Sequence, residues 1–269
     1  RAALDELAGL LEGYSVDGEY RQAVERLHGE WDREVERIYA IRNTPLPSQG
    51  ELIGAVNEMG DPDGIMVCAA GSLPGDLHKL WRARHPKNYH LEYGYSTMGY
   101  EIAGGLGIKM AEPEREVYVM VGDGSYLMLN SELATSVMLG MKLVVVVLDN
   151  RGFGCINRLQ QACGGAPFNN LLEDCIRAAP EPPRIDFAAH AIALGARGEN
   201  VANIAGLEAA MARARASDRT YVIAIETDPD RTTAEGGWWW DVAVPEVSPR
   251  EKVREARAQY ERERKQQRP

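Results

Sequence analysis

Residues 117–150 read VYVMVGDGSYLMLNSELATSVMLGMKLVVVVLDN, in which two apolar runs flank a helix-like segment. Short, continuous, valine-rich runs are typical of strands that are buried on both faces of a parallel sheet. The segment between them has about the length of the crossover helix that connects two parallel neighbours. These residues therefore predict a strand, a crossover helix over NSELATSVMLG, and a second strand parallel to the first.

The alternation of apolar runs and helical segments continues on both sides of this stretch. The further runs are IMVCAA and YHLEYG upstream, and a short ARGEN and YVIAIET downstream. Right-handed crossovers between such strands build a sheet that is covered by helices on both faces. We predict the fold class α/β, with a doubly wound parallel sheet of about six strands and helical N- and C-terminal extensions.

The chain of 269 residues divides into three predicted parts. Residues 1–45 carry two amphipathic helical patterns, which indicate a helical segment from the end of a preceding domain or linker. Residues 46–230 form the sheet domain, whose first helix Ser48 can cap. Residues 231–269 are a C-terminal extension that ends in a highly charged helix. Because the chain starts inside a helical pattern without a methionine, we expect a truncated N-terminus.

Composition excludes several classes of function. Thirty Lys and Arg against forty Asp and Glu give a formal charge of -10, which leaves no basic surface for nucleic acid or anionic lipid. No apolar run approaches the roughly 20 residues of a membrane span. The four cysteines lack CxxC spacing and the five histidines lack paired spacing, so disulfides and a histidine metal site are not expected. We predict a soluble, cytoplasmic protein, in which any anionic ligand must be neutralised locally.

Two polar side chains follow the central apolar runs. Asp123 comes after VYVMVG, and Asn150 comes 27 residues later, after KLVVVVLD. The carboxyl ends of parallel strands meet at one edge of the sheet, so these two side chains can lie close together. With a backbone carbonyl they would offer the hard oxygen ligands of magnesium, whose open positions phosphate oxygens and water commonly fill. Gly124 and Ser125 open the next helix, where N–H groups attract anions.

The residues alone leave a plainer alternative open. GDG is equally compatible with a strand-to-helix turn in which Asp123 caps the helix, and Gly152 and Gly154 could mark an ordinary loop. Glycines 104, 105 and 107 could suggest a dinucleotide fold, but EIAGGLG lies inside a helical segment rather than after a strand. The pairing of GDG with a buried strand and Asn favours a magnesium-bridged diphosphate.

The spacing of GDG and Asn150 resembles the signature of thiamin-diphosphate enzymes related to acetolactate synthase and pyruvate decarboxylase. The resemblance implies thiamin diphosphate and Mg2+ as cofactors, and Asp123, Asn150 and the Gly152 carbonyl as metal ligands. The further cofactor-binding residues it implies are Gly71, Ser72, Leu73, Ser96, Met98, Gly122, Gly124 and Ser125. This chain has Asp149 before Asn150, where the family usually has a second asparagine. That extra carboxylate could point away or support the metal ligands.

The sequence segments around the signature indicate a more specific branch of the superfamily. SLPGDL, EYGYSTMGYEIAGGLG, DNRGFGCINRLQ, RIDFAAHA and GGWWWDVAVPEVSPREKVREA resemble a branch of the superfamily that hydrolyses a carbon–carbon bond of a cyclic 1,2-dione in myo-inositol breakdown. The similarity runs from Ser48 to Ala256. It implies a small cyclic dione as substrate. A related lyase or carboligase acting on 2-oxo acids, and a domain that only binds, remain alternatives.

One expected part has no counterpart in this chain. Enzymes of this family use a glutamate on a separate pyrimidine-binding domain to activate the cofactor, so the catalytic residues here are unknown. We expect that domain in the same or a neighbouring chain, a homo-oligomer (dimer or tetramer), and no activity of this chain alone. His78, His90 and His190 could handle protons or be ordinary surface or core residues. The segment 161–185 is predicted to be a surface loop or lid, and Trp238–Trp240 a site wall or interface.

Overall fold

The structure, a computed structural model, describes residues 1–175, 181–234 and 242–267. Trp238–Trp240 therefore lie outside the described residues. By compactness the chain forms two units, Arg1–Ile38 and Tyr39–Pro269. The first unit contains α1 (Ala2–Leu10) and most of α2 (Gly18–Tyr39), and α1 buries none of its side chains. In the described parts of the chain, no helix is long and apolar enough to span a bilayer.

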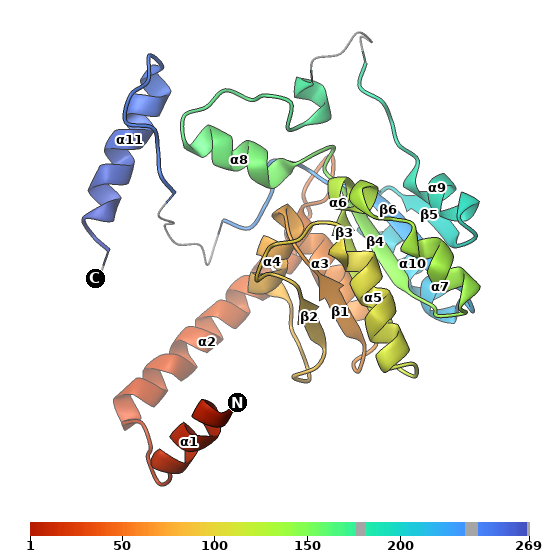
Figure 1. Cartoon of the computed structure of the whole chain (residues 1–269), viewed down its shortest axis with the longest axis horizontal. Helices are drawn as coiled ribbons and strands as arrows, with labels where there is room; N and C mark the ends of the chain where they lie inside the picture. The colour runs from red at the N-terminus through yellow and green to blue at the C-terminus, as the bar shows by residue number, and fades with distance from the viewer. Residues whose placement is uncertain (176–180, 235–241, 268–269) are drawn as a thin grey trace. The chain divides into compact units, whose positions relative to one another are not determined.

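The described residues of the second unit form one six-stranded sheet (Figure 1). Its strands are β1 (Ile65–Cys68), β2 (Tyr89–Leu91), β3 (Val117–Gly122), β4 (Val144–Asp149), β5 (Arg197–Val201) and β6 (Tyr221–Glu226). They lie in the order β2-β1-β3-β4-β6-β5, and every neighbouring pair is parallel. The predicted doubly wound α/β class is confirmed. The order reverses between β1 and β3, the place where such sheets bind ligands.

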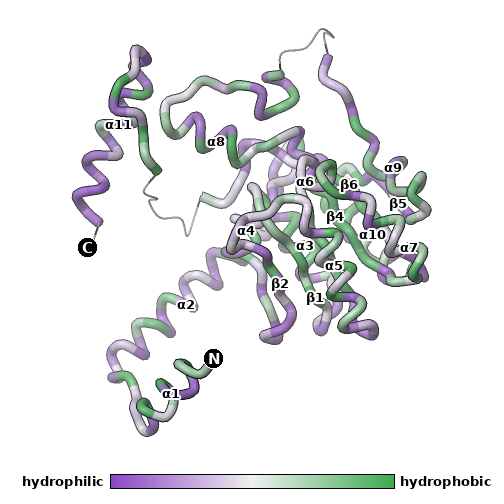
Figure 2. The backbone as a smooth tube through the Cα atoms, in the orientation of Figure 1, coloured by the Kyte–Doolittle hydropathy of each residue, from purple (hydrophilic) through white to green (hydrophobic). Residues whose placement is uncertain are grey.

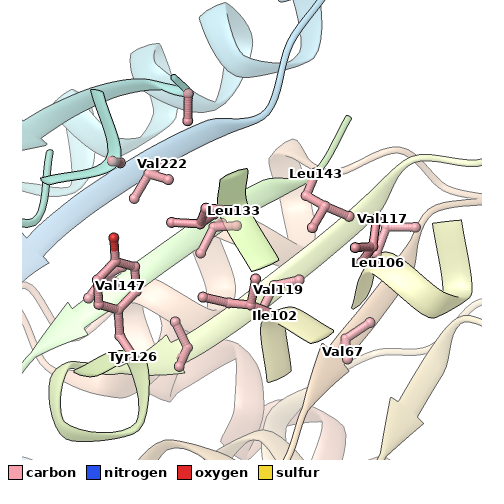
Figure 3. Close-up of a cluster of buried hydrophobic side chains, with 14 of the residues drawn as sticks. Val67, Ile102, Leu106, Val117, Val119, Tyr126, Leu133, Leu143, Val147 and Val222 are labelled. Carbon is pink, nitrogen blue, oxygen red and sulfur yellow. The ribbon is translucent and has the colours of Figure 1, made fainter. Parts of the chain in front are cut away.

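Valine side chains of the central strands form the core on one face of the sheet. Val119 of β3 and Val147 of β4 are fully buried there, together with Leu133 and Tyr126 from the crossover (Figure 3). Hydrophobic residues are concentrated in the strands, whereas the C-terminal helix is largely hydrophilic (Figure 2). Burial on both faces explains why β4 begins with four valines and a leucine, because its first five positions are buried from water.

Helices cover both faces of this sheet. The face with the valine core is covered by α5 (Tyr100–Ala111), α6 (Asp123–Met128), α7 (Glu132–Met138) and α9 (Phe187–Ala193). The other helices of this domain are α3 (Gln49–Met59), α4 (Ser72–Leu80), α8 (Gly154–Ala162) and α10 (Ile204–Ala216). Of these, α3 packs beside both α4 and α10. As predicted, EIAGGLG lies inside a helix, and Ser48 caps α3, where it forms a capping box with Glu51.

The crossover between β3 and β4 differs from the prediction of one helix over NSELATSVMLG. It consists of two short helices, α6 and α7, separated by residues 129–131. The break occurs at Asn130, whose side-chain amide donates to the carbonyl of Tyr126 at 3.1 Å and ends the first helix. Helix α6 thus begins at Asp123 itself, directly after the strand. This places the predicted metal ligand on the first turn of a helix.

The C-terminal extension ends in α11 (Glu251–Arg264). Val253 and Tyr260 of this helix form a small apolar cluster with Val244 and Cys163, at the end of α8. A Cβ on Gly164 would lie 2.4 Å from the carbonyl oxygen of Lys252, so glycine is needed where α11 crosses this turn. Within 161–185, the described residues include one short 3-10 turn, Leu172–Asp174.

Candidate cofactor and metal site

A cavity of about 350 Å³ opens at the carboxyl ends of β1, β3 and β4. It is lined by the turns that follow these strands, and we call it the β1–β3–β4 cavity. All eleven residues predicted to bind cofactor or metal line it: Gly71, Ser72, Leu73, Ser96, Met98, Gly122, Asp123, Gly124, Ser125, Asn150 and Gly152. The sequence had given no reason to expect Gln49, Tyr93, Phe153 and Leu159, which also line the cavity.

Three oxygen atoms converge at the metal end of this cavity. With the Asn150 amide oxygen turned inward, that oxygen lies 2.7 Å from Gly152 O and 3.1 Å from Asp123 Oδ1. Octahedral magnesium at 2.0–2.1 Å from each ligand separates adjacent oxygens by about 2.9 Å, so the donor set fits this ion. With the amide turned over, its nitrogen donates to the same two oxygens. Only the orientation with the amide oxygen inward presents three oxygen ligands to one cation, because an amide N–H2 group donates and does not bind a metal.

The Asp123 carboxylate is buried, with 5% of its surface exposed. Its pKa is raised to about 7, chiefly by burial and secondly by the nearby Asp149 carboxylate, while the N–H groups of Gly124 and Gly152 act in the opposite direction. A carboxylate held at such a cost in desolvation is typical of a functional site. A cation at this position would offset the cost.

The backbone around Gly152 fixes the direction of its carbonyl. Gly152 has φ +143° and pairs with Leu171, and its neighbour Phe153 donates to Asn170 O at 2.7 Å. A Cβ at position 152 would lie 2.3 Å from Asn170 O, which is a backbone atom. Only glycine fits this conformation and this close approach. The loop before the 3-10 turn therefore supports one of the predicted metal ligands.

Asp149 points away from the converging oxygens. Its Oδ1 accepts the N–H of Arg151 at 2.8 Å. Its side chain lines a second cavity of about 520 Å³, at the carboxyl ends of β4, β6 and β5, which we call the β4–β6–β5 cavity. Of the two roles left open for this carboxylate, the structure favours the one in which it points away. It acts on Asp123 through its charge alone.

Glu101 is a buried carboxylate that the sequence analysis missed. Both of its oxygens accept the hydroxyl of Ser125 at 2.8 Å, and Oε2 accepts the N–H of Gly99 at 3.0 Å. Only 1% of the residue is exposed, and burial raises its pKa, opposed by these bonds and one from Ala70. The carboxylate thus joins three turns that line the cavity. A charged residue among the apolar positions of EIAGGLG was the signal available.

Tyr93, Ser96 and Met98 line the cavity from the segment between β2 and α5. Met98 is half-buried at the cavity, and Ser96 lies exposed at its rim with φ +51°. The loop between them and Glu92 is held by that glutamate, which accepts the N–H groups of Tyr95 and Thr97. This wall offers an apolar surface for a flat ring.

None of the three candidate histidines lines the β1–β3–β4 cavity, as far as the described residues form it. His90 contacts the Tyr100 hydroxyl at 2.7 Å, and His190 contacts that of Tyr126 at 2.9 Å. His78 packs edge-on against Tyr93, with ring centroids 4.9 Å apart, and reaches the cavity wall only through that ring. The structure therefore places none of the three in the lining of this cavity.

The chain is similar to proteins of known activity. It is 39% identical over 284 residues to the 3D-(3,5/4)-trihydroxycyclohexane-1,2-dione hydrolase of Halalkalibacterium halodurans, covering 95% of this chain and 44% of that protein. The Bacillus subtilis protein of the same name is 37% identical over 290 residues, with 95% and 43% covered. The chain thus spans less than half the length of these relatives.

Among solved structures, a thiamine diphosphate-dependent 4-hydroxybenzoylformate decarboxylase of Rhodococcus jostii RHA1 has the same fold. The TM-score is 0.62 at 21% identity, and the match covers 71% of this chain and 34% of that one. The family described as "Thiamine pyrophosphate enzyme, C-terminal TPP binding domain" matches residues 69–225, which is more than half of the chain. The chain belongs to this family of thiamine pyrophosphate-binding domains.

Proposed function

We propose that this chain is the C-terminal, cofactor-binding part of a 3D-(3,5/4)-trihydroxycyclohexane-1,2-dione hydrolase. That enzyme would open the cyclic dione of myo-inositol degradation to 5-deoxyglucuronate. One observation carries the proposal: all eleven predicted residues line one cavity, in which the oxygens of Asp123, Asn150 and Gly152 converge. The identity to the named hydrolases over 95% of the chain supports the choice of reaction.

The metal-binding end would hold Mg2+ through Asp123, Asn150 and the Gly152 carbonyl. The ion would supply positive charge that offsets part of the charge of the diphosphate. This solves the problem of an acidic protein that binds an anion. The turn after β1, with Gly71 and Ser72, would contact the diphosphate from the opposite side.

Hydrolysis of the ring adds one water across the bond between the two carbonyl carbons, so that one becomes a carboxylate and the other an aldehyde. Bound thiamin diphosphate supplies the nucleophilic carbon and the electron sink for this cleavage. The residues of this chain would position that cofactor. Met98 supports its rings, while Phe153 and Leu159 shield the cavity from bulk water.

The activating glutamate is expected on a pyrimidine-binding domain, in the same or a neighbouring chain of a homo-oligomer (dimer or tetramer). Exposed apolar side chains beside the cavity support a covering partner: Leu127, Met128, Leu129 and Ile156 are 41–52% exposed. We place the protein in the cytoplasm, where its four cysteines would stay reduced.

Two measurements test this function. Calorimetry of the chain with thiamin diphosphate should show binding that requires Mg2+. The assembled enzyme, with its pyrimidine-binding domain, should open the cyclic dione and leave pyruvate unchanged, and the chain alone should turn over neither compound. Turnover of pyruvate instead would favour the 2-oxo acid lyase or carboligase. Binding without turnover in the assembled enzyme would leave a binding-only domain.

A further inference from the structure

The wall of the β1–β3–β4 cavity is nearly uncharged. Within the described residues, its lining contains no Lys or Arg, and Asp123 is its one charged side chain. A diphosphate carries more than one negative charge, so a single Mg2+ shared with Asp123 leaves the anion incompletely neutralised. A second source of positive charge or of hydrogen-bond donors is therefore needed beside the cavity.

Arg158 is a candidate that would act through the cavity wall. Its Nη2 donates to Ser72 Oγ at 2.8 Å from α8. Gln49, the first residue of α3, donates its Nε2 to the same oxygen at 3.0 Å. Ser72 itself opens α4 and lines the cavity. Three helices thus converge on one hydroxyl at the diphosphate end.

The two donors determine where the Ser72 proton points. A hydroxyl oxygen has two lone pairs and one proton. Arg158 and Gln49 occupy both lone pairs, and no hydrogen bond donated by Ser72 Oγ is found among the described residues. The proton is left to point into the cavity, where it can meet an acceptor. A ligand group that can only donate would find no partner there.

We propose that Arg158 is a positioning residue for the cofactor's diphosphate: it orients the Ser72 hydroxyl as a donor to a phosphate oxygen and brings a positive charge behind it. The inference rests on the proposed function and deepens it, because it assigns the recognition of the phosphate end to α8. It also explains how the cavity binds an anion without a basic side chain in its wall.

The surroundings of Arg158 support this role. A Cβ on Gly154 would lie 2.9 Å from Asn150 Nδ2 and 3.5 Å from Arg158 Nη1, so the guanidinium lies near the metal end as well. Its Nη1 is buried and has no hydrogen-bond partner in the described chain. A buried, charged donor without a partner needs an explanation, and a neighbouring anion provides one.

Asp76 fixes the position of Gln49, one of the two donors to the Ser72 hydroxyl. Its carboxylate accepts Gln49 Nε2 at 3.3 Å and the N–H of Thr233 at 3.2 Å, and it is buried. Gln49 therefore contacts both Asp76 and Ser72, and its amide cannot turn over without losing both acceptors. The orientation of the serine hydroxyl is fixed by buried neighbours rather than by solvent.

The test compares Arg158→Met, Arg158→Lys, Ser72→Ala and the double variant Ser72→Ala/Arg158→Met, with Arg197→Met as the control. Arg197 lies at the start of β5, at the opposite sheet edge, in an exposed pair with Asp218. Calorimetry would measure Mg2+ alone, then pyrophosphate and thiamin diphosphate in the presence of Mg2+. We expect Arg158→Met and Ser72→Ala each to weaken pyrophosphate binding roughly 10-fold.

The double variant should bind about as weakly as Arg158→Met, because the arginine acts through the serine. Arg158→Lys should recover most of the affinity, and Mg2+ alone should bind as in the wild type. A merely structural role would weaken Mg2+ and pyrophosphate together. Wild-type affinity for pyrophosphate in Arg158→Met, or independent losses in the double variant, would overturn the inference alone. If the wild type binds no pyrophosphate with Mg2+, the proposed function fails and the inference with it.

Discussion

Two cavities flank Asp123 at the same edge of the sheet, and they differ in charge. The β1–β3–β4 cavity is lined by glycines, small polar residues and apolar side chains. The β4–β6–β5 cavity is larger, about 520 Å³ against about 350 Å³. Its lining includes both acidic and basic side chains: Asp149, Arg151, Arg184, Asp186 and Glu226.

The charges of the larger cavity are satisfied by their own neighbours. Arg184 lies 3.8 Å from the Glu226 carboxylate, and Asp186 accepts the N–H of Ala189 and the amide of Asn200. At the smaller cavity, the side-chain amide of Asn150 lies within 3.1 Å of both Gly152 O and Asp123 Oδ1. Position at the carboxyl edge and size are therefore not sufficient for a cofactor site. The convergent Asp123, Asn150 and Gly152 groups, whose donor set fits Mg2+, distinguish the smaller cavity from the larger one.

Removing the carboxylate of Asp123, which lines both cavities, or that of Glu226, which lines only the larger one, tests this contrast with the largest expected effect. Asp123→Ala should reduce Mg2+-dependent binding of thiamin diphosphate by at least about 100-fold, because it removes a direct metal ligand. Glu226→Gln should leave that affinity nearly unchanged. Titration calorimetry measures both. Because Asp123 is buried with a raised pKa, its variant should remain folded, which a thermal melt can verify. Equal losses in the two variants would contradict the distinction between the cavities.

Alanine substitutions at two glycines of the smaller cavity distinguish displacement of a metal ligand from backbone strain. Gly152→Ala forces a Cβ into the backbone at Asn170 and should displace the carbonyl ligand. We expect a loss of about 3 kcal/mol in unfolding free energy, together with weaker Mg2+ binding. Gly71 also has positive φ, +119°, but its Cβ would meet nothing within 4 Å. Gly71→Ala should therefore cost only about 1–2 kcal/mol of strain and leave Mg2+ affinity intact.

Urea unfolding and Mg2+ titration of both glycine variants separate strain from ligand displacement. An unchanged Mg2+ affinity in Gly152→Ala would show that its carbonyl is not a ligand. A weakened affinity in Gly71→Ala would show that backbone strain alone disturbs the metal end.

Features that depend on residues close together in the sequence could be predicted from the sequence. Continuous valine runs predicted β3 and β4, because strands buried on both faces have no polar positions. Asp123 and Asn150 follow those strands directly, so parallel pairing alone brings them to one edge. The residues that resemblance placed around the cofactor lie in the same turns, and the cavity contains all of them.

What escaped prediction depends on contacts between distant segments. Arg158 meets Ser72 across 86 positions of the chain, and Glu101 meets Ser125 across 24. Helical periodicity shows which face of α8 or α5 is polar, but it does not show which turn that face will reach. The break at Asn130 was missed for a related reason, because a single side-chain bond to Tyr126 decides it.

Glu101 provides the next test, with an intermediate effect. Glu101→Gln replaces one acceptor oxygen by an amide that opposes the N–H of Gly99 or the hydroxyl of Ser125. We expect a loss of about 1–3 kcal/mol in unfolding free energy and a several-fold weaker binding of thiamin diphosphate. Glu114→Gln, on the exposed turn after α5, is the matched control and should change neither. Urea unfolding and calorimetry give both quantities. If Glu101→Gln resembles the control, the three turns are held together by other contacts.

The smallest expected effect is the change in the pH dependence of stability when Asp76 is replaced by Asn. Burial raises its pKa from 3.8 to about 6, although Lys79 and Arg158 lie near it. The folded state therefore binds this proton more tightly than the unfolded state does. Its contribution to stability is fully present below pH 3.8 and is lost as the pH rises through 6. Between pH 5 and pH 7 the wild type should lose roughly 1 kcal/mol more than Asp76→Asn.

Urea unfolding of both proteins at the two pH values measures this difference. The comparison is needed because burial also raises the pKa of Asp123 and Glu101, so both contribute a decrease of the same sign. Equal pH dependence in the two proteins would show that Asp76 ionises normally in the fold. Arg158→Met gives a further check. Without the nearby guanidinium, the Asp76 carboxylate loses a favourable charge, so the decrease in stability should move to higher pH. That shift would show that Asp76 and Arg158 interact behind the wall of the smaller cavity.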